Sequence, residues 1–313
     1  MSRILVIKLS ALGDFVQAFG PFAAIRTHHP ASRITLLTTA PYADLARRSP
    51  WFDEVWIDER PKPWQIGKLL RLRRRLRDGA FSRVYDLQTS GRSSRYLTLM
   101  GGPRAVEWCG IAPGCSHPHA NPDRDDMHTL DRQADQLAAV GILGIPKPDL
   151  SWLDADITGF GLPARFALLV PGGAPHRPDK RWPADRYAAL AVRLTAAGLT
   201  PVVLGTASES AEGQAITAAC PQTVSLIGRT GFPDIAALAR KAVAAVGNDT
   251  GPMHLIAATG CRSVVLYSHA SDPALCAQRG PAVTIVRRRS LEELAVEEVA
   301  GLLLDKPAGP SYP

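Results

Sequence analysis

The sequence is poor in cysteine and has no long uninterrupted apolar run. Five cysteines are scattered over 313 residues, an odd set that argues against a disulfide framework and for reduced thiols. The most apolar stretch, residues 9–25, is interrupted by Asp14 and Gln17, whereas a membrane-spanning helix needs about 20 apolar residues. The chain also opens without the basic and apolar segments of a secretory signal. These absences predict a cytoplasmic protein without a transmembrane helix.

The remaining composition is that of a soluble globular protein. Hydrophobic residues make up 46% and charged residues 21%, which excludes disordered and collagen-like chains. The length predicts two domains, since one domain takes roughly 150 residues. The net charge of +7 is uneven, because residues 1–155 hold 21 Lys and Arg against 16 Asp and Glu. The first half therefore favours an anionic partner.

Much of this positive charge lies in residues 68–77, KLLRLRRRLR. The apolar residues at positions 69, 70, 72 and 76 form one helical stripe under a basic face. Such a helix suits anionic lipid headgroups, an acidic substrate or nucleic acid. A solvated face that keeps the protein soluble explains the pattern equally well.

Short β-branched runs alternate with helical patterns along the chain, which predicts βαβ units and mostly parallel sheets. The fold class is therefore α/β, with two Rossmann-like domains. The expected strands are residues 3–8, 33–38, 54–58, 83–87, 166–170, 200–204, 223–227, 242–246, 263–267 and 283–286. The expected helices are residues 14–26, 43–48, 64–77, 93–100, 130–140, 185–197, 209–219, 232–240, 252–259 and 291–304.

Two stretches interrupt the alternation. Residues 101–126, rich in Gly, Pro, His and Asp, predict one long irregular loop. Residues 144–163 have little periodicity and predict the linker between domains at 1–155 and 156–313. The last helix is a candidate to pack back on the first domain, and the tail at 306–313 is expected to be disordered.

Ligands of open α/β sheets bind beyond the carboxyl ends of the strands, so the strand-to-helix junctions are the candidate sites. The first is KLSALGD at residues 8–14, which lacks the glycine pattern of a nucleotide-phosphate loop. Asp14 would stand there as a carboxylate able to accept a proton from a hydroxyl. The pairing of Asp14 with Gln17 is also a capping box, and that structural role alone would explain the aspartate.

The second junction is the loop at 171–183, PGGAPHRPDKRWP. Its glycines let backbone amides approach an anion, and four basic or potentially basic side chains gather in it: His176, Arg177, Lys180 and Arg181. A diphosphate would suit this loop. A turn with exposed charges explains the prolines but not the clustering of cations.

The third junction is GNDTGPMH at residues 247–254. Asp249 or Thr250 would cap the following helix, and Pro252 is preorganised for its first turn. Gly251 would permit a ligand to come close, and His254 would lie one helical turn further on. A structural histidine is the alternative reading.

Soft ligands also gather at residues 109–119, in the pattern C-x5-C-S-H-P-H. Structural zinc sites use a closer cysteine pair and a separated second pair. The spacing therefore favours a loop over a metal centre, and neither a metal nor a cofactor is predicted.

Taken in order, these junctions resemble glycosyltransferase family 9, the ADP-heptose:lipopolysaccharide heptosyltransferases, over nearly the whole chain. KLSALGD is similar to the family's N-terminal motif, whose aspartate is the proposed general base and whose lysine lies in the active site. The resemblance thus implies catalytic roles for Asp14 and Lys8. The family's charged acceptor segment corresponds to residues 88–92, which makes Gln88 and Arg92 candidate acceptor contacts.

The second half carries the donor motifs. DKRWPADRY at 179–187 resembles the family's Lys-x-Trp-Pro signature, whose lysine meets the donor diphosphate, and GNDTGPMH resembles its Asp-Thr-Gly-x-x-His motif. Ser271-Asp272-Pro273 looks like the family's turn near the donor base, and an acidic residue is implied for the ribose, with Glu209 or Glu212 as the candidates. The implied donor-binding residues are Lys180, Glu209, Asp249, Thr250, Gly251 and His254.

The resemblance implies a GT-B architecture in which two Rossmann-like domains face each other across a cleft, an acceptor-binding one and a donor-binding one. It implies an inverting, metal-independent transfer of heptose from an ADP-activated donor to a lipopolysaccharide core acceptor. The expected partners are this donor, a lipid A core or related anionic glycolipid, and the inner membrane surface, but no nucleic acid. The alternatives are a nucleotide-sugar epimerase of similar fold and a non-catalytic nucleotide-binding protein.

Overall fold

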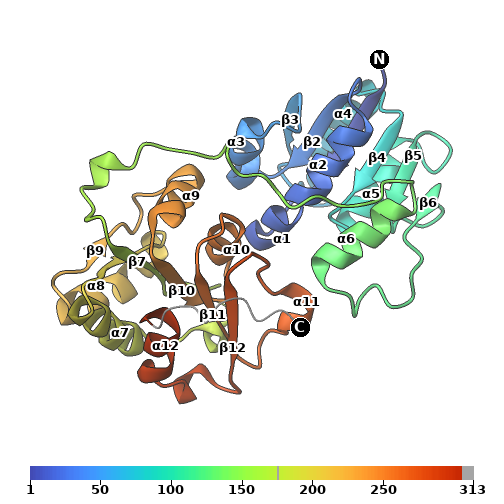
Figure 1. The fold of residues 1–313 in the computed structure, drawn as a ribbon. Helices are drawn as coiled ribbons and strands as arrows, with labels where there is room; N and C mark the ends of the chain where they lie inside the picture. The colour runs from blue at the N-terminus through green and yellow to red at the C-terminus, as the bar shows by residue number, and fades with distance from the viewer. Residues whose placement is uncertain (175, 305–313) are drawn as a thin grey trace. The chain divides into compact units, whose positions relative to one another are not determined.

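The computed structural model describes residues 1–174 and 176–304. The chain divides into two compact units, Met1–Trp152 and Leu153–Pro313. The disorder expected for residues 306–313 lies outside the described residues. Each unit is built on one six-stranded sheet in which every pairing is parallel, and helices connect its strands (Figure 1). The α/β fold class predicted from the sequence is confirmed.

The sheet of the first unit has the order β3-β2-β1-β4-β5-β6. This is the doubly wound order in which the chain reverses direction across the sheet between β1 and β4. Its strands are β1 (Arg3–Ile7), β2 (Arg33–Thr38), β3 (Glu54–Ile57), β4 (Arg83–Asp86), β5 (Glu107–Gly110) and β6 (His117–Pro118). Its helices are α1 (Leu12–Gln17), α2 (Phe19–His28), α3 (Ala40–Arg48), α4 (Ile66–Asp78), α5 (Gly91–Met100) and α6 (Thr129–Ala138).

Two predictions for the first unit need correction. The helix expected at 14–26 begins at Leu12 and is divided into α1 and α2 around Ala18. The irregular loop expected at 101–126 contains β5 and β6, which extend the sheet. These strands have four and two residues, too few to show an alternating pattern. Trp108 and Cys109 of β5 are nevertheless fully buried, and they anchor this edge of the sheet.

The sheet of the second unit repeats the topology, with the order β12-β11-β10-β7-β8-β9. Its strands are β7 (Phe166–Val170), β8 (Thr200–Val203), β9 (Val224–Ser225), β10 (Ala244–Asn248), β11 (Ser263–Tyr267) and β12 (Val283–Arg287). Its helices are α7 (Ala184–Ala196), α8 (Ser210–Ala219), α9 (Phe232–Lys241), α10 (Gly251–Ala258), α11 (Pro273–Cys276) and α12 (Val296–Leu304), with 3-10 turns at 158–160, 178–180, 207–209 and 291–293. Here the chain reverses direction between β7 and β10.

The last helix of the chain, α12, contacts α7, β10 and β11 of its own unit. Val299 and Leu303 are buried in the same hydrophobic cluster as Leu190 and Leu194 of α7. Trp182 is buried there as well, and its indole N–H donates to the carbonyl of Leu294 at 3.1 Å. These apolar contacts fix α12 on the sheet of the second unit.

Candidate functional site

The predicted site residues follow the strands at which each sheet reverses direction. Lys8 follows β1, and the loop beginning at Pro171 follows β7. Asp249 follows β10, and residues 87–89 follow β4. Crevices at such switch points are the binding sites of open α/β sheets. The fold therefore supplies one candidate binding edge in each unit.

In the first unit, Lys8 and Asp14 share an electrostatic environment. Lys8 is buried, and its ammonium donates to the carbonyl of Leu87 at 3.0 Å. Burial lowers the pKa of Lys8, and the negative charges of Asp14 and Asp86 act in the opposite direction. Asp14 is partly exposed, so its carboxylate can be reached from solvent.

The structural role predicted for Asp14 is present in a different form. Ala11, not Asp14, is the N-cap of α1, and Asp14 is the third residue of the helix. One carboxylate oxygen of Asp14 accepts the backbone N–H of Ala11 at 3.2 Å. Capping uses this oxygen and leaves the other without an assigned structural role. Asp14 can therefore cap its helix and remain available as a proton acceptor.

Gln88 shapes the loop that carries Lys8 and Asp14. Its side-chain oxygen accepts the backbone N–H of Leu9 at 2.7 Å and that of Ser10 at 3.1 Å. Arg92, predicted with it as an acceptor contact, donates to the carbonyl of Pro61 at 3.3 Å. The structure thus gives both residues intramolecular partners, and acceptor binding by either remains a prediction.

Asp86, the last residue of β4, is a buried carboxylate that the sequence analysis did not single out. One of its oxygens accepts the backbone N–H of Gln88 at 3.1 Å and that of Thr89 at 3.0 Å. Thr89 has a φ of 44°, a left-handed conformation that a non-glycine residue adopts at a cost. The carboxylate stabilises this turn and so positions Gln88. Its place at the end of a strand beside the switch point was the available signal.

The burial of Asp86 predicts a pH dependence of stability. Burial raises the pKa of Asp86 to about 6, roughly two units above that of an aspartate in an unfolded chain. Between about pH 4 and pH 6 the folded protein holds a proton that the unfolded chain has lost, so stability falls as the pH rises. Asp86→Asn keeps the accepting oxygen and removes this titration. Urea unfolding of variant and parent should show that, from pH 4.5 to pH 7.5, the free energy of unfolding of the variant rises relative to that of the parent by about 2 kcal/mol. An unchanged difference would contradict the assignment.

Two arginines near Asp14 were also missed. Arg132 of α6 is half-buried, and burial lowers its pKa while the charge of Asp14 opposes this shift. Arg60 donates to the hydroxyl of Ser10 at 2.8 Å. The sequence predicted the helix that carries Arg132 but not which of its faces meets the loop at 8–14. Lys8, Arg60 and Arg132 together make the surroundings of Asp14 positive, which suits an anionic substrate.

In the second unit, Asn248 joins two of the predicted motifs. It is the last residue of β10 and is completely buried. Its side-chain oxygen accepts the backbone N–H of Trp182 at 2.9 Å, and its amide nitrogen donates to the carbonyls of Pro171 at 2.8 Å and Gly172 at 3.1 Å. Because these bonds span the loop at 171–182, Asn248 holds the loop beside the start of α10.

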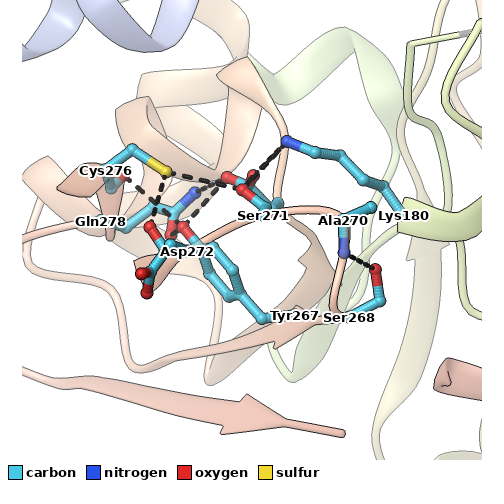
Figure 2. A network of polar contacts seen from close by, with 9 residues as sticks. Lys180, Tyr267, Ser268, Ala270, Ser271, Asp272, Cys276 and Gln278 are labelled. Atoms are coloured by element: carbon cyan, nitrogen blue, oxygen red, sulfur yellow. Dashed lines mark hydrogen bonds and ion pairs between the residues drawn. The ribbon is translucent and has the colours of Figure 1, made fainter. Parts of the chain in front are cut away.

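Lys180 and Asp249 form the centre of this site. The ammonium of Lys180 lies 2.6 Å from a carboxylate oxygen of Asp249 and 3.1 Å from the hydroxyl of Ser271. The Ser271 hydroxyl donates to the same oxygen of Asp249 at 2.6 Å. Figure 2 shows Lys180 and Ser271 converging from separate segments of the chain. Three of the sequence motifs thus meet at one carboxylate.

The other oxygen of Asp249 also has partners. It lies 3.0 Å from the hydroxyl of Tyr267 and 3.2 Å from the amide nitrogen of Gln278. Burial alone would raise the pKa of Asp249, but the hydrogen bonds from Lys180 and Ser271 and the charge of Lys180 hold it below its usual range. Burial and the neighbouring charge of Asp249 raise the pKa of Tyr267. Asp249 is therefore a fixed anion, and the lysine beside it is oriented by it.

The helix after Asp249 begins as the sequence predicted, but its N-cap forms no side-chain capping bond. Thr250 is the N-cap of α10 and Gly251 is its first residue. The Thr250 hydroxyl is buried without a hydrogen-bond partner among the described residues. His254 is buried one turn further on, close enough for an electrostatic interaction that helps to lower the pKa of Asp249. An unpartnered buried hydroxyl at a helix start is a natural contact for a ligand oxygen.

Glu209 lies at the carboxyl end of the neighbouring strand, β8. One oxygen of its buried carboxylate accepts the backbone N–H and the hydroxyl of Thr206, both at 2.8 Å. Its side chain fills the space beside Gly172, where an added Cβ would lie 3.0 Å from the Glu209 Cγ. Glu212, the alternative ribose contact, instead pairs with Arg181 at 2.9 Å. Glu209 therefore packs on the loop that carries Lys180, and Glu212 contacts its far end.

The cations of the 171–183 loop do not act as one cluster. Lys180 points to Asp249, whereas Arg181 pairs with Glu212 and donates to the carbonyl of Gly173 at 2.6 Å. Consecutive side chains leave the 3-10 turn at 178–180 in different directions, and the sequence could not reveal this. Of these two side chains, that of Lys180 contacts the Asp249 carboxylate.

Within the described residues no group of three or more His, Cys, Asp or Glu side chains is arranged to hold a metal ion. Cys109 lies in β5, and burial raises the pKa of its thiol to about 12. His119 contacts Asp135 at 2.8 Å.

In the part of the chain that the structure describes, no helix is both long and apolar enough to cross a membrane.

The chain is similar to known proteins. The sequence profile of a family described as "Glycosyltransferase family 9 (heptosyltransferase)" matches residues 69–299. Lipopolysaccharide heptosyltransferase 2 of Escherichia coli is 27% identical over 303 residues, covering 86% of this chain and 83% of that protein.

Two solved structures have the same fold. The structure of the E. coli ADP-heptose lps heptosyltransferase II has a TM-score of 0.76 at 24% identity, covering 97% of this chain and 99% of that chain. A glycosyl transferase family 9 protein from Veillonella parvula has a TM-score of 0.78 at 21% identity, covering 97% of both chains.

Proposed function

Because the chain belongs to glycosyltransferase family 9 and is a glycosyltransferase, we propose that it transfers a heptose from an ADP-activated donor to a lipopolysaccharide core. The observation that carries the proposal is the meeting of Lys180, Asp249 and Ser271 at the switch point of the second sheet. The names of the relatives support the donor and the acceptor: they include an ADP-heptose lps heptosyltransferase II and a lipopolysaccharide heptosyltransferase 2.

The proposed reaction is a single inverting displacement without a metal ion. Asp14 accepts the proton of an acceptor hydroxyl, the hydroxyl oxygen forms a bond to the anomeric carbon of the donor, and the bond from that carbon to the diphosphate oxygen breaks. The electron pair leaves with ADP. Such a mechanism requires the first unit to supply the base and the second to hold the donor, and it requires the two to meet during turnover.

In the second unit, Lys180 and the start of α10 hold the diphosphate in this proposal. Asp249 orients the ammonium of Lys180, and the helix start presents backbone N–H groups and the Thr250 hydroxyl, which has no hydrogen-bond partner in the described part of the chain. Gly251 allows close approach, and His254 lies beside the same carboxylate. Glu209 is the proposed ribose contact, by virtue of its place at the end of β8.

In the first unit, the positive surroundings of Asp14 attract an acceptor that carries phosphate or carboxylate groups. Lys8 contributes a buried ammonium, and Arg60 and Arg132 flank the same loop. Gln88 and Arg92 are proposed acceptor contacts. Gln88 is hydrogen-bonded to the backbone of Leu9, and Arg92 to that of Pro61. This arrangement is consistent with an anionic glycolipid acceptor.

The nucleotide specificity is tested by thermal-shift screening with ADP-, UDP- and GDP-sugars. ADP-heptose should raise the melting temperature, since a ligand at about 100 times its dissociation constant stabilises the folded state by about 2.7 kcal/mol. UDP- and GDP-sugars at the same concentration should shift it much less. A larger shift with either of these would reject ADP as the donor nucleotide.

The proposal also includes a cytoplasmic location, peripheral on the inner face of the inner membrane. The support is the chemistry of the acceptor, which is a glycolipid, and the exposed basic side chains of α4. Arg71, Arg73 and Arg74 are among those exposed side chains.

A further inference from the structure

An unusual concentration of exposed apolar side chains lies at the start of α4. Trp64 is 71% exposed, Ile66 65% and Leu70 55%; these three residues are the α4 tip. Ile66 and Leu70 are four residues apart and share one face of the helix. Leu72 and Leu76 lie on a different face and are buried in the core. The tip is therefore not part of the stripe that anchors α4.

Positive charge surrounds the α4 tip. Lys62 lies over the ring of Trp64, with its ammonium 5.0 Å from the ring centroid. Arg73 and Arg74 follow Leu70 by three and four residues and are exposed on the same side of the helix. The guanidinium of Arg75 lies over the ring of Trp56, 4.4 Å from the ring centroid. The exposed face thus combines apolar side chains at one end with arginines along its length.

We infer that the α4 tip and the arginines behind it form a docking surface for a bilayer that contains anionic lipid. Tryptophan and long apolar side chains favour the headgroup region, while arginines gain from the negative surface potential. Nucleic acid would use the cations and stack on Trp64, but it has no use for Ile66 and Leu70. The combination of chemistries favours lipid.

The inference deepens the proposed peripheral location, and it is tested by binding alone. The full chain is mixed with vesicles of phosphatidylcholine, with or without 30 mol% phosphatidylglycerol as an experimental choice of roughly cytoplasmic charge density. Sedimentation should show binding to the anionic vesicles that weakens with salt. Emission of Trp64 should shift to shorter wavelength, and Trp64→Phe should abolish the shift. No donor or acceptor is present, so failure here leaves the transfer reaction untouched.

Two pairs of variants separate charge from insertion. Arg73→Gln with Arg74→Gln should weaken binding about 30-fold, since each basic residue near the surface contributes roughly fivefold; Arg47→Gln with Arg48→Gln on α3 is the control with the same change in charge. Ile66→Ser with Leu70→Ser should weaken binding by at least about tenfold. Val192→Ser with Val243→Ser removes exposed apolar groups elsewhere and should have no effect.

Three results would overturn the inference. The first is no binding to anionic vesicles, and the second is full binding by the Ile66→Ser and Leu70→Ser variant. The third is a loss of binding in the control variants as large as that in the variants they are matched to. Saturable binding to duplex or single-stranded nucleic acid, with none to vesicles, would assign the surface to that partner instead. Melting temperatures within about 2 °C of the parent show that a loss of binding is not a loss of folding.

Discussion

Asp14→Asn should lower kcat for sugar transfer by about 10²–10⁴ and leave the affinity for the donor nucleotide unchanged. The amide retains an oxygen that can accept the Ala11 N–H, so the capping bond at the start of α1 survives. What is lost is the ability to take a proton from the acceptor hydroxyl. Steady-state kinetics measures the loss, and calorimetric titration with ADP measures the donor affinity.

The control for this variant is Asp44→Asn, which removes a carboxylate of the same unit whose side chain is 90% exposed and pairs with Arg47. It should retain parental kcat. If Asp14→Asn turned over at a near-normal rate, the base would have to be another group, and the role assigned to the loop at 8–14 would be wrong. A fall in ADP affinity equal to the fall in kcat would point to a structural effect.

Lys180→Ala should lower kcat by about 10²–10³ and also weaken donor binding. The ammonium is proposed to stabilise charge on the departing diphosphate, and preorganised groups of this kind contribute more as charge develops. The same variant should be less stable, because it leaves the buried carboxylate of Asp249 without its cation. Kinetics with varied donor and thermal unfolding measure the two effects.

A second variant separates these effects. Lys180→Met combined with Asp249→Asn removes both charges and should recover most of the lost stability. It should not recover transfer, since the diphosphate still lacks its cation. If the double variant regained activity together with stability, Lys180 would be a structural residue and the donor site would lie elsewhere.

The repeating architecture could be predicted because each strand is a short β-branched run flanked by helical patterns. Phe166–Val170, Ser263–Tyr267 and Arg33–Thr38 have the predicted bounds. β5 was missed because four residues between glycines and prolines carry too little periodicity. The start of α1 was also displaced, since its N-cap is Ala11 and Asp14 lies within the helix.

Site residues that belong to a contiguous sequence motif could be predicted. Site residues that come together only in the tertiary structure could not. The motif residues Lys180 and Asp249 could be named from the sequence, and their contact at 2.6 Å follows only from the sheet order that places β10 beside β7. Arg132 reaches the loop at 8–14 from a helix more than a hundred residues away in the sequence, and no local pattern marks it. Asp86 had a signal in its position at a strand end, but its burial came from the tertiary structure.

The loop at 171–183 shows that charges close in sequence can take different partners in space. Its four basic or potentially basic residues suggested a common anion site, yet Lys180 and Arg181 take different partners. The sequence shows how many charged residues a loop contains, but a binding site depends on where their side chains point. In a turn, consecutive side chains point in different directions.

The most direct test of the account is product analysis with ADP-heptose in the presence and absence of a lipopolysaccharide core acceptor. Mass spectrometry should find the acceptor heavier by one heptose and ADP released in equal amount, and NMR should find the new linkage with the anomeric configuration opposite to that of the donor. Without acceptor, the donor should remain intact. Equal conversion of the donor with and without acceptor would contradict the account and assign the site to hydrolysis or epimerisation.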